Sequence, residues 1–206
     1  MMDVNKKNTL CVYAHGGICM STDGMNKPCC SILTPRNNQP PMWNENHGET
    51  DWRKSLRNHL ANGVKDERCD KCWDQEAAGI RSMRLGSNER LENDLVTEHE
   101  WSYVDLKLGS KCNLMCNMCD AASSSLIAKE KWNNYKEGWW HKSGNSKDSK
   151  KKIWADYKQA GLTDELQWWQ NPAFYEKIKE NAKHIRTLKF TGGEPTINPN
   201  FLPFVK

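Results

Sequence analysis

The alternation of apolar and polar residues along the chain predicts four strands. Two short strands are expected at residues 9–21 and 25–33, and the turn residues 21–24 between them favour a hairpin. Two further strands are expected at residues 101–108 and 185–191, where apolar side chains recur at every second position. The first pair is expected to belong to a small α+β module and the second pair to an α/β domain.

Caps and stop signals predict helices between and after these strands. A helix capped at Thr50 or Asp51 is expected over residues 50–62, and another over residues 69–78. Residues 79–100 are expected to form a charged connector. Within the segment that joins the last two strands, we expect helices at residues 123–137, 151–159 and 171–183 and a polar loop at residues 138–150.

The helical crossover between residues 101–108 and 185–191 completes a βαβ unit, which predicts that these two strands run parallel. The same crossover is rich in tryptophan, and large aromatic side chains bury much apolar surface. We expect them to pack the helices of the crossover onto one another and onto the sheet. The tryptophans concerned are Trp132, Trp139, Trp140, Trp154, Trp168 and Trp169.

Composition favours metal-binding thiols over disulfides. The 206 residues include nine cysteines, an odd number that does not make a complete disulfide set. The first residues are polar and charged, unlike a signal peptide, and no apolar run approaches the ~20 residues of a membrane span. We therefore expect a cytoplasmic protein with reduced cysteines and no membrane association. The net charge of +4 is mild, and the lysine-rich residues 146–152 indicate a solvated loop without nucleic-acid binding.

Three cysteines follow the strand at residues 101–108 in one tight loop. Cys112, Cys116 and Cys119 are separated by three and by two residues. Three thiolates can hold three irons of a [4Fe-4S] cluster and leave the fourth iron open to a small ligand. The alternative is a zinc knuckle completed by a distant residue.

A second motif ends the strand at residues 185–191. Gly192 and Gly193 allow a ligand to lie against the backbone, because neither has a Cβ atom. Glu194 can bind an ammonium group in a charge-assisted hydrogen bond, and Pro195 closes the motif.

The cysteine loop and the Gly192–Pro195 motif together resemble the radical S-adenosylmethionine (radical SAM) superfamily. The resemblance implies that Cys112, Cys116 and Cys119 bind a [4Fe-4S] cluster and that Gly192, Gly193, Glu194 and Pro195 contact S-adenosylmethionine. It implies reductive cleavage of that cofactor to a 5′-deoxyadenosyl radical, which abstracts hydrogen from a substrate. It also implies a partial (β/α)6 barrel, of which this chain would contain the first two parallel strands, as an N-terminal fragment of a longer protein.

The remaining cysteines resemble the auxiliary-cluster module of the twitch type, a shortened relative of the SPASM module. The resemblance implies a second [4Fe-4S] cluster on Cys11, Cys29, Cys69 and Cys72. Cys30 is an alternative to Cys29 and Cys19 an alternative to Cys11, although Cys19 suits a strand side chain better. A structural zinc site is the alternative to the cluster. We expect this module at residues 1–93 and the start of the barrel at residues 94–206.

The expected function is therefore that of a radical SAM enzyme, an oxidoreductase or modifying enzyme, with two iron–sulfur clusters. By analogy with relatives the substrate is expected to be a peptide or protein, and the electron donor a flavodoxin or ferredoxin. The alternative is a non-enzymatic zinc module that binds a partner and pairs Cys69 and Cys72 with Cys116 and Cys119. Its gap of 43 residues exceeds the ~15–20 of a zinc ribbon.

Overall fold

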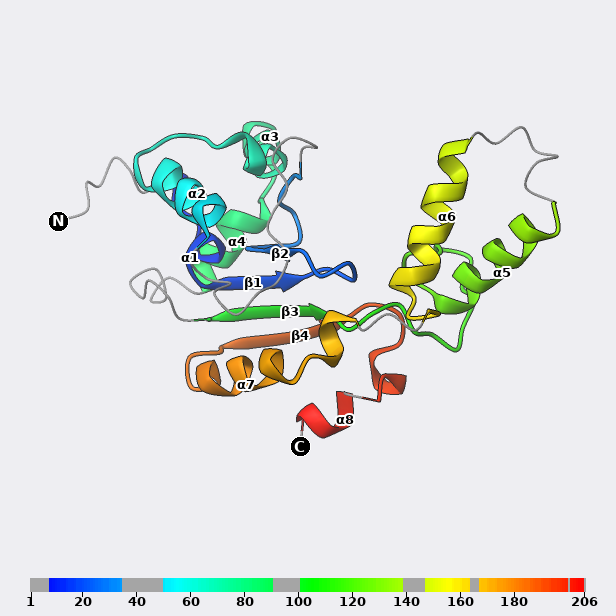
Figure 1. Ribbon diagram of the computed structural model, residues 1–206. Coiled ribbons are helices and arrows are strands. Elements are labelled where there is room, and N and C mark those ends of the chain that lie inside the picture. The colour runs from blue at the N-terminus through cyan, green and yellow to red at the C-terminus, as the bar shows by residue number, and fades with distance from the viewer. Residues whose placement is uncertain are drawn as a thin grey trace. The chain divides into compact units, whose positions relative to one another are not determined.

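The computed structural model describes residues 8–34, 50–90, 101–138, 147–163, 167–199 and 201–205, with only the backbone described at 147–149, 203 and 204 (Figure 1). It is a mixed α/β fold with an open four-stranded mixed sheet in the order β2-β1-β3-β4. None of the helices in these ranges is both long and apolar enough to cross a membrane.

The chain divides into two compact units. The first unit is built from residues 1–20, 25–105 and 177–189, and the second from residues 21–24, 106–176 and 190–206. The predicted boundary between residues 93 and 94 lies outside the described residues.

The predicted hairpin is present in the first unit, but its strands are shorter than expected. β1 (Gly17–Met20) pairs antiparallel with β2 (Asn26–Lys27), with Cys19 opposite Lys27. The expectation of a strand from residue 9 is wrong, because α1 (Val12–Gly16) occupies that segment. The Val12 amide donates to Asn88 Oδ1 at 2.9 Å, so a distant side chain satisfies one of the amides that a helix N-terminus leaves without an intrahelical partner.

Two predicted helices of the first unit are confirmed. α2 (Asp51–Ala61) begins after Thr50, whose side chain accepts a hydrogen bond from the Arg53 amide, and α3 (Asp70–Ala77) follows the short helix η2 (Glu67–Cys69). The buried face of α2 also carries a charged side chain, since Arg53 is only 1% exposed. Its guanidinium donates to the carbonyl oxygens of Gly17 and Lys27 and thereby ties α2 to the hairpin.

The prediction of a connector at residues 79–100 is wrong for the described residues 79–90, because α4 (Met83–Arg90) forms there. The Leu85 amide donates to Ser82 Oγ at 3.1 Å, which satisfies one amide of the first turn. The segment is rich in charged residues, which suggested a solvent-exposed connector, but the Arg84 side chain is buried. Tertiary contacts therefore decide the conformation of a segment whose amphipathic pattern is weak.

The core of the first unit lies between α1, α2, α3 and the start of β3 (Tyr103–Lys107). Aromatic and aliphatic side chains fill it, and the rings of Tyr13 and Tyr103 lie 4.3 Å apart. The buried members are Cys11, Val12, Tyr13, Ala14, Ile32, Leu56, Leu60, Trp73 and Tyr103. The N-terminal cysteine Cys11 is thus part of a packed core.

A buried carboxylate fixes the loop that leads into Cys69. Asp66 Oδ1 accepts from Arg68 Nε at 2.7 Å, and Asp66 Oδ2 lies 2.6 Å from Arg68 Nη2 and 2.7 Å from His59 Nδ1. Burial alone would raise the Asp66 pKa, but the hydrogen bonds from Arg68 and His59 outweigh it and hold this pKa below its usual range.

The Asp66 carboxylate is expected to make stability depend on acid pH. A lowered folded-state pKa contributes stability that is fully present above the unfolded value of about 3.9 and is lost as pH falls through the folded value. Asp66→Asn should lower the free energy of unfolding by about 3 kcal/mol at pH 7 and flatten its slope below pH 4. Urea unfolding from pH 2 to 7 measures the free energy of unfolding and its pH dependence. The same pH dependence in the wild-type chain and in Asp66→Asn would contradict this role.

The second unit contains most of the crossover between β3 and β4, whose residues 177–189 belong to the first unit. β4 (Thr187–Thr191) lies beside β3, and the pair runs parallel as predicted, because Ser102 O accepts from the Thr187 amide while Thr191 O accepts from the Leu108 amide. The helices between them are α5 (Ser125–Lys136), α6 (Lys147–Gln159), the short η5 (Trp168–Gln170) and α7 (Pro172–Asn181), and η6 (Pro195–Ile197) and α8 (Phe201–Val205) follow β4. The predicted loop at residues 138–150 is wrong at its end, since α6 begins at Lys147.

Tryptophans pack the crossover helices together, as expected. α5 and α6 lie side by side (Figure 1), and the rings of Trp132 and Trp154 are 4.8 Å apart. Trp169, in η5, is buried, and a Cβ added to Gly109 would lie 2.6 Å from its ring. Trp139 and Trp140 lie outside the described residues.

Candidate cysteine-rich metal centres

Two serines at the start of α5 anchor the loop with Cys112, Cys116 and Cys119. The Ser125 amide donates to Ser110 O at 2.7 Å, and Ser125 Oγ accepts from the Cys112 amide at 3.0 Å. Ser124 Oγ donates to Leu114 O at 2.9 Å. The strand end before the loop and the helix start after it therefore close around the cysteine segment.

The three cysteines of this loop influence one another. Loss of hydration raises the pKa of Cys119, and the neighbouring Cys116 and Cys112 side chains raise it further. Cys116 is exposed, whereas Cys112 and Cys119 are half-buried. The loop also presents Met118, which is 94% exposed, so the thiols lie at an accessible surface.

The Gly192–Pro195 motif lies directly against the backbone that leads into Cys112. The Gly193 amide donates to Gly109 O at 3.2 Å, and the Glu194 amide donates to Lys111 O at 2.8 Å. A Cβ atom on Gly192 would lie 2.3 Å from Gly109 O, and one on Gly193 would lie 2.2 Å from Lys111 O. Only glycine permits this approach, and the two sequence motifs form one continuous surface within the second unit.

Glu194 is held as an anion at the end of this motif. Its carboxylate accepts from the Thr196 hydroxyl at 2.6 Å and from the Thr196 amide at 3.1 Å, at the start of η6. These two bonds hold the pKa of Glu194 below its usual range. Pro195 occupies the first turn of η6, where its missing amide hydrogen costs little.

One residue that supports this surface had no signal in the sequence. Asn198 is buried, and its Nδ2 donates to Leu108 O at 2.7 Å. This bond ties the turn after Pro195 to the end of the strand that carries the cysteine loop. A lone asparagine after a turn gives no indication of such a distant partner.

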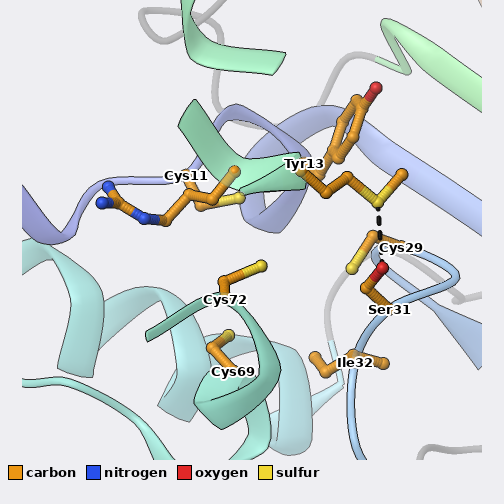
Figure 2. Close-up of a pocket in the computed structure, with 9 residues that line it drawn as sticks. Cys11, Tyr13, Cys29, Ser31, Ile32, Cys69 and Cys72 are labelled. Carbon is orange, nitrogen blue, oxygen red and sulfur yellow. Dashed lines mark hydrogen bonds between the residues drawn. The ribbon is translucent and has the colours of Figure 1, made fainter. Parts of the chain in front are cut away.

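Four other cysteines surround a pocket in the first unit (Figure 2). Figure 2 shows Cys11, Cys29, Cys69 and Cys72 with their sulfur atoms turned toward the same space. Cys11 precedes α1, Cys29 follows β2, and Cys69 and Cys72 lie at the start of α3. The residues that line the pocket are Cys11, Tyr13, Cys29, Ser31, Ile32, Cys69, Cys72, Met83 and Arg84.

The two alternative cysteines lie elsewhere. Cys19 is a buried side chain of β1, in keeping with its interpretation as a strand residue, and does not line the pocket. Cys30 is exposed, and its thiol contacts Met83 Sδ at 3.8 Å. The pocket thus brings Cys69 and Cys72 together with Cys11 and Cys29.

Burial keeps the thiols of Cys11, Cys29 and Cys69 protonated near neutral pH when nothing is bound. It raises the pKa of Cys11 to about 11 and that of Cys69 to about 12, and the neighbouring thiols add to the effect. The pKa of Cys29 is also raised well above its usual value by burial and by Cys11. Because metals bind thiolates, loading this pocket must release protons.

The pocket gathers cysteine side chains, the ligand type that both zinc and iron–sulfur clusters take. Within the described ranges, no group of three or more His, Cys, Asp or Glu side chains is close enough to hold one metal ion. A four-iron cluster binds each cysteine through a different iron, so its thiolates stand further apart than those around one Zn2+. The four cysteines that line this pocket equal in number the protein ligands of such a cluster.

Comparison with known proteins leaves the family open, since no family model, no curated protein and no solved structure matches this chain.

Proposed function

We propose that this chain is a radical SAM protein whose catalytic cluster binds to Cys112, Cys116 and Cys119. The observation that carries the proposal is the backbone pairing of Gly193 and Glu194 with the residues immediately before Cys112. Two motifs separated by 72 residues in the sequence meet there, as they must if one holds a cluster and the other a ligand of that cluster.

Each residue of this surface has a defined task in the proposal. Gly192 and Gly193 let the motif lie against the backbone before Cys112, since a Cβ on either would overlap Gly109 O or Lys111 O, and this approach places Glu194 beside the cysteine loop. The ionised Glu194 accepts hydrogen bonds from the ammonium group of that ligand. When bound, the cluster supplies the electron for reductive cleavage of S-adenosylmethionine, which starts hydrogen abstraction from a substrate.

The four-cysteine pocket is proposed to hold a second [4Fe-4S] cluster. Its four protein ligands leave no open iron, so electron transfer suits it better than substrate ligation. The proposed substrate is a peptide or protein, and the proposed electron donor is a flavodoxin or ferredoxin. Both of these assignments rest on the resemblance to radical SAM proteins.

Iron content tests the two cluster assignments together. After anaerobic reconstitution, the full chain should bind about eight irons and eight sulfides. Replacement of Cys112, Cys116 and Cys119 by alanine should leave about four irons, and so should replacement of Cys11, Cys29, Cys69 and Cys72. Cys19→Ala, outside both sets, is the matched control and should keep the full amount.

The outcomes separate the two sites. About four irons in the wild-type chain and none in the triple variant would remove the second cluster and keep the first. A colourless protein that binds zinc would overturn the proposed activity and leave a structural metal module. Cleavage of S-adenosylmethionine under dithionite should disappear in Glu194→Gln while its iron content stays unchanged.

A further inference from the structure

Helix α4 holds the backbone on both sides of Cys11. Leu10 O accepts from Arg84 Nη1 at 2.9 Å and from Asn88 Nδ2 at 2.8 Å. The Val12 amide donates to Asn88 Oδ1 at 2.9 Å. Two side chains of α4 therefore fix the peptide groups before and after a proposed cluster ligand, across more than 70 residues of sequence.

The same arginine also reaches the helix that carries Cys72. Arg84 Nε donates to Glu76 Oε1 at 2.9 Å, and its Nη2 donates to Glu76 Oε2 at 2.5 Å. Glu76 lies one turn after Cys72 on α3 and also accepts from Ser82 Oγ. The Arg84 guanidinium lies 4.6 Å from the Trp73 ring centre. It is thus held by a bidentate ion pair, an aromatic face and a backbone carbonyl.

Arg84 also carries a charge beside one of the four cysteines, because its guanidinium donates to Leu10 O, in the residue before Cys11. It lines the space around the four cysteines, and its side chain is 5% exposed, so water screens its field weakly. Four thiolates around an iron–sulfur cluster give the site a negative charge, and each added electron makes it more negative. A fixed cation nearby stabilises the reduced form more than the oxidised form.

We infer that Arg84 is the positioning residue of the four-cysteine site and the cation that raises the reduction potential of its cluster, with Glu76 as the opposing charge. This inference rests on the proposed second cluster. Charge near a cluster and hydrogen bonding around it are the features by which proteins set cluster potentials. The sign of the effect therefore differs between the two members of the ion pair.

The test uses the full chain with Cys112, Cys116 and Cys119 replaced by alanine, so that one cluster gives the signal. Potentiometric titration followed by electron paramagnetic resonance compares this parent with Arg84→Gln and Glu76→Gln. At the midpoint potential of the parent, Arg84→Gln should lower the ratio of reduced to oxidised cluster about tenfold, a shift of about −59 mV for one electron. Glu76→Gln should raise the ratio, because it leaves the guanidinium uncompensated.

Arg81→Gln is the matched control. Arg81 lies just before α4 in an ion pair with Glu89, but both side chains are 63% exposed. Its replacement should change the ratio less than about twofold, since solvent screens an exposed charge. If Arg84→Gln binds no iron, the reduction potential is measured in Arg84→Lys and Glu76→Gln, because both variants keep a cation at the site.

The inference would be overturned if the reduction potential stayed unchanged in Arg84→Gln. It would also be overturned if the potential shifted in the same direction in Arg84→Gln and Glu76→Gln, because loss of either partner of a purely structural ion pair should change the site in the same way. A failure of Glu76→Gln to raise the potential would do the same. A parent that binds no iron would overturn the second cluster itself, which iron analysis reveals before any titration.

Discussion

Gly193→Ala is expected to lower the affinity for S-adenosylmethionine by more than about 100-fold while iron stays bound at both cysteine sites. The added Cβ would lie 2.2 Å from Lys111 O and 2.7 Å from the Ser110 carbonyl carbon, both backbone atoms that cannot turn aside. The glycine motif must then move away from the cysteine loop, and the bond from the Glu194 amide to Lys111 O breaks. A displacement of about 1 Å at a binding site suffices for a loss of this size.

Equilibrium dialysis with the reconstituted chain measures this affinity, and iron analysis of the same sample shows that the clusters remain. Gly138→Ala is the control, because a Cβ added there meets no atom within 4 Å. Its positive φ of 78° makes alanine strained, so the control also reports the general cost of replacing a glycine. Equal affinities in the two variants would show that contact between the motifs does not shape the ligand site.

Local signals in the sequence sufficed for the parts of the fold that depend on neighbours in the chain. The cap at Thr50, the proline at the start of α7 and the turn after Met20 each act within a few residues, and each of these predictions is confirmed. The parallel pairing of β3 and β4 followed from the helical crossover alone. Because parallel strands end at the same edge, this pairing also brings together the loops that follow β3 and β4.

The sequence was misleading where distant residues decide the local structure. Residues 12–16 contain strand-forming side chains, but Asn88 satisfies the amide of Val12 and a short helix forms. Residues 83–90 have too weak an apolar face to be recognised as a helix, since Arg84 faces inward and is paired with Glu76. A buried ion pair leaves no periodic apolar pattern, so neither α4 nor its role beside Cys11 was predictable.

The choice among the first four cysteines shows the same limit. Spacing favoured Cys11 and Cys29, but it left Cys19 and Cys30 as alternatives. The structure separates them by direction, because β2 ends at Lys27 and a turn begins at Cys30. Cys29 faces the pocket while Cys30 is exposed, and Cys19 is buried within β1 away from the pocket lining. Direction depends on the exact ends of short strands, which sequence patterns define poorly.

Gly17→Ala is expected to lower the free energy of unfolding by more than about 3 kcal/mol, because it overpacks a buried turn of backbone. A Cβ on Gly17 would lie 2.1 Å from Pro28 O and 2.6 Å from Tyr13 O. Both are main-chain atoms beside the four-cysteine pocket, since Pro28 precedes Cys29 and Tyr13 lines the space. Moving either strand of the hairpin to relieve the overlap would also break the bond from Arg53 to Gly17 O.

Urea unfolding followed by far-ultraviolet circular dichroism measures the loss, and Gly63→Ala provides its control. Gly63 also lies in the first unit, has a positive φ of 78°, and would place a Cβ in open space, so it should cost only about 1 kcal/mol. Since the overlap at Gly17 displaces the segment before Cys29, iron bound by the four-cysteine pocket should fall together with stability. Normal iron content at that pocket in a destabilised Gly17→Ala protein would mean that the hairpin turn and the Cys29 ligand move independently.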